Sequence, residues 1–251
     1  MAMIVAHDVW KAFGEKEVLR GLSLEVEANE TVVIVGRSGV GKSVLLKQII
    51  GIDKPDKGYV EVEGVRISDL EGAALYRATR HMGMLFQGAA LFDSLTVFEN
   101  TAFYLHQHGD PDTGKRIPSQ EVRERVDEAL AMVGLEGTQE LLPSSLSGGM
   151  KKRAALARLI CYRPRLLLYD EPTTGLDPVS ADQINHLIRK TQQELNATSL
   201  VVTHDMRSAI EVGDRLALHH EGQIVFIAPK EEFIRNDHPV IRSFMETAEV
   251  R

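Results

Sequence analysis

An eight-residue segment near the start of the chain, GRSGVGKS, constrains the fold more than any other part of the sequence. Residues 36–43 fit the pattern GxxxxGK[ST]; they follow the apolar run TVVIV and precede a helical pattern over residues 43–50. Glycines let the backbone curl around an anion, and the N-terminus of the following helix adds positive partial charge. The segment therefore predicts a phosphate-binding loop between a strand and a helix; the alternative is a chance glycine turn.

Other short apolar runs alternate with helical patterns, which predicts an α/β core. Residues 59–65 alternate as YVEVEGV, typical of a half-buried strand, whereas 165–169 and 200–203 are apolar runs typical of a parallel sheet. Further strands are predicted at 22–26 and 31–35, with a hairpin of 215–219 and 223–227 around Glu221-Gly222.

The middle of the chain shows mostly helical patterns separated by polar loops, the clearest loop being residues 110–119. Apolar residues at 122, 126, 129, 130 and 133 form one helical stripe. We interpret residues 97–157 as a helical subdomain inserted into an α/β core. The predicted organisation is a single domain of residues 1–251, with the core at 1–96 and 158–236 and a tail at 237–251.

Charge and cysteine content narrow the class of function. The 36 acidic and 29 basic side chains give a net charge of −7, which argues against general nucleic-acid binding but not against one local phosphate site. The only cysteine is Cys161, so no intramolecular disulfide can form and a reducing compartment is expected. We find no signal-peptide pattern and no apolar run of the ~18 residues that a membrane span requires.

A pair of carboxylates ends the apolar strand RLLLYDE, and α/β sheets bind ligands at such strand ends. Adjacent buried acids are costly unless a cation or hydrogen bonds meet them. We expect Asp170 to hold Mg²⁺ through water and Glu171 to orient or deprotonate an attacking water. Lys42 would reach the β- and γ-phosphates of a nucleotide, and the Ser43 hydroxyl would ligate Mg²⁺. The alternative for the carboxylates is a solvated strand end with a turn at Pro172.

A second glycine segment, SLSGGM at residues 145–150, precedes the helical run KKRAALARLI. Its serine and glycines supply donors at a helix N-terminus, which makes a second anion cradle. One nucleotide needs one phosphate-binding loop, so we predict a dimer in which each second cradle completes the partner's site. The alternative is an ordinary serine N-cap followed by a glycine turn.

Together these segments resemble the ATP-binding-cassette (ABC) ATPases, the nucleotide-binding subunits of ABC transporters, over nearly the whole chain. LSGGM resembles the family's signature loop, and GLD at residues 175–177 resembles its D-loop. Gln87 resembles the glutamine that senses the γ-phosphate and Mg²⁺, His204 the switch histidine, and Phe13 the aromatic residue that stacks on adenine. The resemblance is weakest at residues 104–122 and after 232.

The resemblance implies a P-loop NTPase (RecA-like) core with an antiparallel β-subdomain and an inserted helical subdomain. It implies the reaction ATP + H₂O → ADP + phosphate, with Mg²⁺ as cofactor. The implied catalytic residues are Lys42, Glu171 and His204; the nucleotide-binding residues are Phe13, Gly36, Arg37, Ser38, Gly39, Val40, Gly41, Lys42, Ser43, Val44 and Gln87. The metal is assigned to Ser43, Gln87 and Asp170 (via water), the signature loop in trans to Ser147, Gly148, Gly149 and Met150, and the D-loop to Gly175, Leu176 and Asp177.

Three positions depart from the family pattern. Met150 replaces the usual glutamine of the signature loop and loses its polar contact, although the serine and glycine donors remain. Asn29-Glu30 replaces Gly-Glu before the loop strand, and asparagine still tolerates left-handed geometry. Phe13 stands where tyrosine is common and keeps the stacking face.

One stretch indicates the branch of the family: FQGAALFDSLTVFEN at residues 86–100 resembles the ATPases of bacterial Mce-type phospholipid transport. This branch implies a homodimer on the cytoplasmic face of the inner membrane, with a permease dimer, a periplasmic Mce lipid-binding protein and a small STAS-type cytoplasmic protein as partners. The alternatives are an ABC importer ATPase for another solute, such as an amino acid or a metal, and a non-transport ABC ATPase acting on ribosomes or chromosomes.

Two apolar segments have open assignments. Residues 89–98 are predicted to contribute to a groove for a permease helix, although their large apolar side chains could instead fill the local core. In the tail, Val240, Ile241, Phe244, Met245 and Ala248 form a helical stripe after Pro239, with Asp237 as the expected N-cap. This helix could pack on its own subunit or dock on another.

Overall fold

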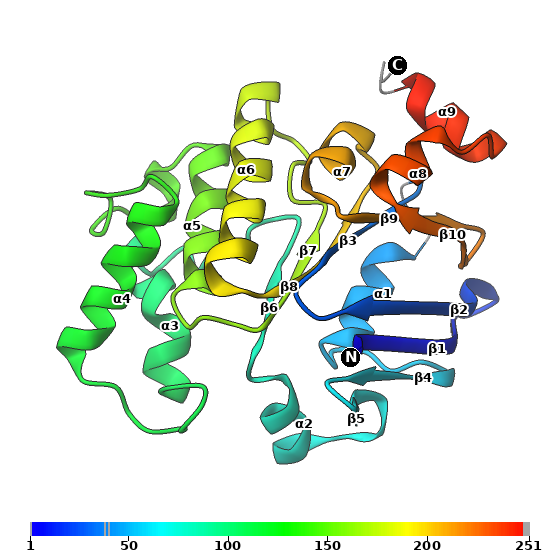
Figure 1. Cartoon of the computed structure of the whole chain (residues 1–251). Coiled ribbons are helices and arrows are strands. Elements are labelled where there is room, and N and C mark those ends of the chain that lie inside the picture. The colour runs from blue at the N-terminus through cyan, green and yellow to red at the C-terminus, as the bar shows by residue number, and fades with distance from the viewer. Residues whose placement is uncertain (1, 38, 40, 248–251) are drawn as a thin grey trace.

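Two β-sheets organise the part of the chain that the computed structural model describes, residues 2–37, 39 and 41–247. Within those residues, the larger sheet has six strands in the order β10-β9-β3-β8-β7-β6, and the smaller has four in the order β2-β1-β4-β5 (Figure 1). The larger sheet consists of β3 (Thr31–Val35), β6 (Met82–Leu85), β7 (Leu166–Asp170), β8 (Thr198–Thr203), β9 (Arg215–His220) and β10 (Gln223–Pro229). The smaller sheet consists of β1 (Ala2–Phe13), β2 (Lys16–Glu27), β4 (Lys57–Val62) and β5 (Val65–Arg66).

The larger sheet is parallel from β9 to β6, and only β10 runs antiparallel to its neighbour. Every residue of β3, β7 and β8 is buried, as expected for strands covered on both faces. Val35 lies opposite Thr203, and Asp170 opposite Val202, so these three strands end at one edge of the sheet. The loops that follow them therefore meet there. The α/β fold class is confirmed.

The smaller sheet is antiparallel throughout. One strand predicted from the sequence is corrected here. Residues 59–65 do not form a single strand, because the chain turns back at Glu63 and Gly64, whose φ angles are 49° and 75°. Two consecutive residues with positive φ make the tight turn of a hairpin. The predicted hairpin at residues 215–227 is confirmed, with Glu221 and Gly222 between β9 and β10.

Helices cover both faces of the larger sheet (Figure 1). Among the described residues no helix is both long and apolar enough to cross a bilayer. The α-helices are α1 (Lys42–Ile49), α2 (Gly72–Thr79), α3 (Val97–His108), α4 (Ser119–Met132), α5 (Gly148–Ile160), α6 (Pro178–Leu195), α7 (Met206–Val212), α8 (Lys230–Arg235) and α9 (Pro239–Thr247). In the part of the chain that the structure describes, short 3₁₀ turns lie at Ile67–Asp69 and Pro143–Ser145.

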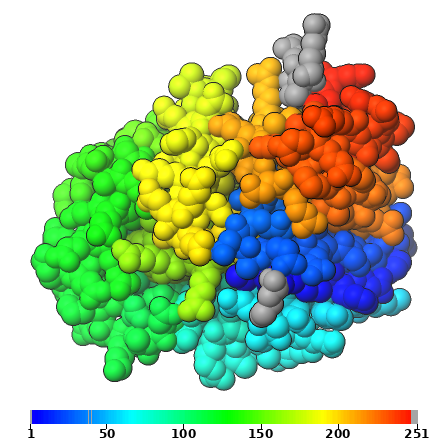
Figure 2. All heavy atoms as spheres, in the orientation of Figure 1, coloured from blue at the N-terminus to red at the C-terminus, as the bar shows by residue number. Residues whose placement is uncertain are grey.

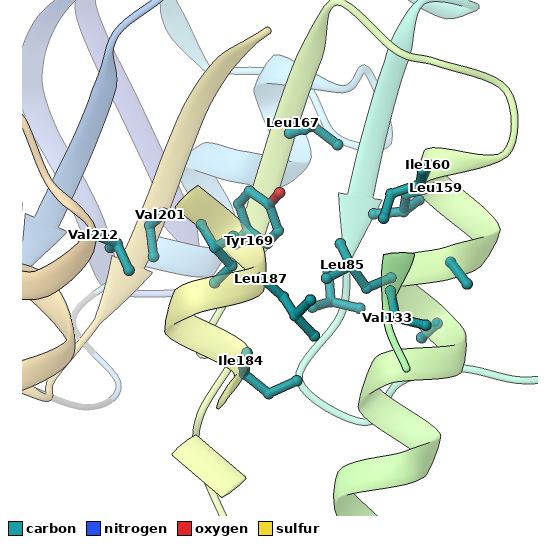
Figure 3. Close-up of a cluster of buried hydrophobic side chains, with 14 of the residues drawn as sticks. Leu85, Val133, Leu159, Ile160, Leu167, Tyr169, Ile184, Leu187, Val201 and Val212 are labelled. Atoms are coloured by element: carbon teal, nitrogen blue, oxygen red, sulfur yellow. The ribbon is translucent and has the colours of Figure 1, made fainter. Parts of the chain in front are cut away.

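Alternate residues of the larger sheet enter two separate hydrophobic clusters. Val33 and Val35 face one cluster with α3 to α7, whereas Val32 and Ile34 face another with α1 and the smaller sheet. Figure 3 shows part of the first cluster, where strand residues such as Tyr169 and Val201 meet side chains of α5 and α6. All five residues of the predicted stripe on α4 and its end are buried: Val122, Val126, Ala129, Leu130 and Val133.

The tail forms α9 and packs on this chain beside α8 (Figure 2). Ile241 and Met245 are buried in the first cluster, whereas Phe244 is only half-buried. The predicted N-cap was wrong: the His238 ring accepts a hydrogen bond from Val240 N, and the Asp237 carboxylate pairs instead with Arg242. Ala248, the last residue of the predicted stripe, lies outside the described residues. Docking of the tail on another subunit remains a hypothesis.

Candidate nucleotide-binding site

The loop between β3 and α1 depends on glycines for different reasons at its two ends. A Cβ on Gly36 would lie 2.6 Å from the carbonyl oxygen of His219, so β9 leaves no room for a side chain there. Gly41 has a φ of 105°, and a Cβ would lie 2.6 Å from Val18 Cγ1. Because Gly36 and Gly41 have no side chain, the loop can pack directly against β9 and β2. Ser38 and Val40, which we assigned to nucleotide binding, lie outside the described residues.

Lys42 directs its ammonium into the loop. Its Nζ donates hydrogen bonds to the carbonyl oxygens of Gly36 at 2.6 Å and Arg37 at 2.9 Å, and it lies 3.4 Å from Glu171 Oε1. The side chain is 4% exposed. Burial lowers the pKa of Lys42, while the carboxylates of Glu171 and Asp170 oppose that shift. A positive charge is thus held where the loop and the end of β7 meet.

Asp170 and Ser43 form a compact oxygen-rich pair, with the Ser43 hydroxyl donating to Asp170 Oδ1 at 2.6 Å. Burial raises the pKa of Asp170, against the hydrogen bond from Ser43, because the buried carboxylate is poorly solvated. A divalent cation beside it would stabilise the charged form. Hydroxyl, carboxylate and amide oxygens suit Mg²⁺, so Ser43, Asp170 and Gln87 fit such an ion. Within the described residues, no group of three or more His, Cys, Asp or Glu side chains could hold a metal.

Glu171 is the centre of a hydrogen-bond network at the end of β7. Its Oε2 lies 2.9 Å from His204 Nδ1 and accepts hydrogen bonds from the hydroxyls of Thr174 at 3.2 Å and Thr203 at 3.3 Å. The φ of Glu171 is 47°, a left-handed conformation that is rare outside glycine and asparagine and is often found at functional sites. The carboxylate is therefore fixed in direction while its other oxygen faces Lys42. The two threonines were not among the predicted site residues.

A cleft of about 390 Å³ is lined by nine of the predicted catalytic and nucleotide-binding residues. Phe13, at the end of β1, is 54% exposed and lies on its wall with Lys16 and Val18, two residues that the sequence patterns did not indicate. The cleft is lined by Phe13, Lys16, Val18, Gly39, Gly41, Lys42, Ser43, Val44, Gln87, Glu171, Thr174 and His204.

The segment that follows Gln87 is strained and held by a residue that sequence analysis missed. Gln87 is exposed, and Ala89 and Ala90 both have positive φ, 63° and 52°. The Arg158 guanidinium on α5 donates to the carbonyl oxygen of Ala90 at 2.7 Å and to that of Ala89 at 3.2 Å. Two non-glycine residues in this conformation persist only when their surroundings hold them there.

The signature and D-loop segments lie outside the cleft. Ser147 is the N-cap of α5 and accepts a hydrogen bond from Met150 N at 3.3 Å, so the ordinary capping role is present. Asp177 caps α6 through Val179 N and Ser180 N. The two segments adjoin, because a Cβ on Gly149 would lie 3.3 Å from Ser180 Oγ. The remaining predicted residues of these segments, Gly148, Gly175 and Leu176, also do not line the cleft.

Beneath the loop lies His219, which is 2% exposed and has no hydrogen-bond partner for either ring nitrogen among the described residues. Burial, together with the charge of Lys42, lowers the pKa of His219 to about 4. The imidazole is therefore neutral at physiological pH and acts as packing beneath Gly36. No sequence motif indicated this residue.

Comparisons with known proteins agree with this geometry. A family model described as "ABC transporter" matches residues 19–174. "Probable ribonucleotide transport ATP-binding protein mkl" of Mycobacterium tuberculosis is 38% identical over 242 residues, which are 96% of this chain; the chain spans 66% of that protein's length. "Intermembrane phospholipid transport system ATP-binding protein MlaF" of Haemophilus influenzae is 36% identical over 233 residues, 93% of this chain and 86% of MlaF. Import ATP-binding proteins named for methionine and Fe(3+) match at 39% and 36% identity.

Solved structures extend the similarity to three dimensions. The dimeric post-hydrolysis structure of the ATP-binding cassette MJ0796, bound to ADP and Pi, superposes with a TM-score of 0.82 at 32% identity. The match covers 91% of this chain and 99% of MJ0796. The loop, the two carboxylates and the glutamine segment occur here in a fold shared with that cassette. The chain therefore belongs to the ABC transporter family, with the fold of an ATP-binding cassette.

Proposed function

We propose that Lys42, Glu171 and His204 carry out ATP hydrolysis at the edge of the larger sheet. The contact of Glu171 with both Lys42 and His204 carries this assignment. The loop N–H groups and Lys42 bind the phosphates and stabilise negative charge on the transferring phosphoryl group. Glu171 orients or deprotonates the attacking water, and His204 holds the carboxylate and contacts the γ-phosphate. Bound Mg²⁺ would neutralise phosphate charge beside Ser43, Asp170 and Gln87.

We propose further that two copies of the chain close on two nucleotides. The signature residues Ser147 to Met150 would then meet the nucleotide bound by the partner, because they lie outside this chain's own cleft. A ligand that binds the closed dimer more tightly than the open one shifts the population toward closure. Loss of the bridging γ-phosphate on hydrolysis allows the dimer to reopen. The dimeric form of the MJ0796 cassette supports this arrangement.

For the transported substrate we propose phospholipid, moved between the inner and outer membranes of a bacterium. The similarity to MlaF over 86% of its length and the stretch at residues 86–100 support this proposal. The implied partners are a permease dimer, a periplasmic Mce protein and a small STAS-type protein, with the ATPase on the cytoplasmic face of the inner membrane. Phe92, which is 42% exposed and contacts Phe103, is available for the permease helix.

A second candidate is an importer ATPase for an amino acid or a metal, which the matches to the methionine and Fe(3+) import proteins favour. Affinity purification of the native complex from membranes, followed by mass spectrometry of proteins and lipids, distinguishes the two. We expect a permease, an Mce protein and bound phospholipid. Recovery of a periplasmic solute-binding protein without an Mce protein would instead support the importer.

A further inference from the structure

Lys11, on β1, is held in place by the segment that follows α1. Its Nζ donates hydrogen bonds to Asp53 Oδ1 at 2.8 Å and to the carbonyl oxygen of Lys54 at 2.7 Å, and it lies 3.5 Å from Asp56 Oδ1. The side chain is 12% exposed. Burial alone would lower the pKa of Lys11, but its hydrogen bonds and ion pairs with Asp53 and Asp56 outweigh burial and raise it. Lys11 is therefore a fixed positive charge.

The same ammonium lies over the ring of Phe13, 5.5 Å from the ring centroid. The face of an aromatic ring carries negative partial charge, so a cation within about 6 Å of the centroid is attracted to it. Phe13 is 54% exposed and lies on the wall of the cleft that contains Lys42 and Ser43. An exposed ring at the end of a strand would otherwise be free to change its rotamer.

We infer that Lys11 is a positioning residue for the nucleotide base: held by Asp53 and Asp56, it fixes the Phe13 ring in the orientation on which the base stacks. This inference rests on the proposed function together with the expectation from sequence that the adenine base stacks on Phe13. Lys11 does not touch the base and acts through the ring. Its attraction to nucleotide phosphates is weak, since two carboxylates neutralise its charge.

Lys11 also joins β1 to the segment after α1, and a purely structural role would show itself in stability alone. The Lys11→Met variant keeps the alkyl chain and removes the charge, whereas Lys11→Arg keeps a cation. Lys57→Met is the matched control, because Lys57 Nζ lies 5.8 Å from the Trp10 ring centroid on the same sheet and neither residue lines the cleft. Phe13→Leu removes the ring.

Binding of ATP and of inorganic tripolyphosphate to the purified chain is measured for each variant by calorimetry, with steady-state hydrolysis in parallel. We expect Lys11→Met to weaken ATP binding and raise KM by about two- to fivefold, the size of an exposed cation–π interaction. Tripolyphosphate binding and kcat should stay as in the unmodified chain, and Lys11→Arg should restore ATP affinity. In the Phe13→Leu background, Lys11→Met should have no further effect.

Three outcomes would overturn the inference: additive effects of Lys11→Met and Phe13→Leu, equal weakening of ATP and tripolyphosphate, or a lower melting temperature with unchanged ATP affinity. A failure of the proposed function would give results different from these three. If Lys42→Ala leaves both ligands bound as before, the site itself is wrongly assigned. If only Phe13→Leu is without effect on ATP, the base stacks elsewhere and Lys11 has no role in binding it.

Discussion

The two glycine segments of this chain differ in the charge around them. The loop after β3 surrounds a buried lysine that faces a buried glutamate, and a second carboxylate lies beside Ser43. At the signature segment, Ser147 and Gly148 are exposed, and the helix cap there is formed by a neutral hydroxyl. The first segment gathers acidic and basic side chains within this chain. The second offers a hydroxyl and backbone N–H groups at an exposed helix N-terminus.

This difference indicates a separate role for each of the two glycine segments. Charged groups that select and activate a phosphate need burial and fixed partners, which only the folded chain supplies. Neutral donors at a helix N-terminus need neither burial nor a charged partner, so they can bind an anion that another molecule brings. The loop after β3 should therefore bind nucleotide in the isolated chain, and the signature segment should affect only steps that involve two chains.

The largest expected effect is that of Glu171→Gln, which retains size but removes the base. We expect ATP hydrolysis to fall by about 100- to 10,000-fold, the usual contribution of a general base, while ATP binding persists. The loss of one negative charge should also favour the closed dimer with ATP and Mg²⁺. Phosphate release and size-exclusion chromatography measure the two effects. Glu136→Gln, at an exposed position, is the control; turnover like that of the unmodified chain in Glu171→Gln would refute its role.

Lys42→Ala tests the first segment at the binding step. Removing a charge-assisted contact to phosphate should weaken ATP binding by roughly 10- to 100-fold, corresponding to about 1.5–3 kcal/mol. Calorimetry on the isolated chain measures this change, with exposed Lys115, which lies outside the cleft, replaced by alanine as the control. If affinity is unchanged, Lys42 does not contact the nucleotide.

His219 tests whether the first segment depends on neutral packing beneath it. Its pKa is about 4 in the folded chain and ~6.5 when unfolded. Above pH 6.5 the ring is neutral in both states; as pH falls the unfolded state binds a proton first, so stability is lost from about pH 7 toward pH 4. The loss between pH 7.5 and pH 5 should be about 2 kcal/mol, roughly thirtyfold in the unfolding equilibrium.

Urea unfolding of His219→Leu as a function of pH measures this contribution. The variant should show a shallower decline in stability below pH 7, whereas His220→Gln should follow the unmodified chain. The same slope in His219→Leu would mean that another group causes the acid sensitivity.

Ser147→Ala should have the smallest effect of the four. We expect nucleotide affinity of the isolated chain to be unchanged and turnover to fall by about tenfold, since one hydrogen bond to an anion is lost. Part of the change is structural, because loss of an N-cap costs about 1 kcal/mol of stability. Ser145→Ala is the neighbouring control. Weaker ATP binding by chains that remain monomeric would contradict the division between the two segments.

The sequence predicted the parts of the site that local patterns encode. The loop, the carboxylates at the end of β7 and the strand alternation follow from short-range spacing, and Asn29 does adopt the left-handed conformation expected of it, with a φ of 64°. Other features depend on contacts between distant residues. Arg158 meets Ala90 from 68 positions away, and the Lys11 contacts span 42 and 43 positions. The turn at Glu63-Gly64 was overlooked because Val65 was counted in the alternating run, although Gly64 interrupts the period-2 pattern.

The contact of Arg158 with the strained alanines has a mechanical consequence. Ser147 begins α5 and Arg158 lies near its other end, so one uninterrupted rod of roughly 16 Å joins the signature segment to the residues after Gln87. Any tilt of this rod moves both of its ends. A displacement imposed at the signature segment by a second chain would thus pull on a backbone that already stores strain, a few residues from the glutamine that lines the cleft.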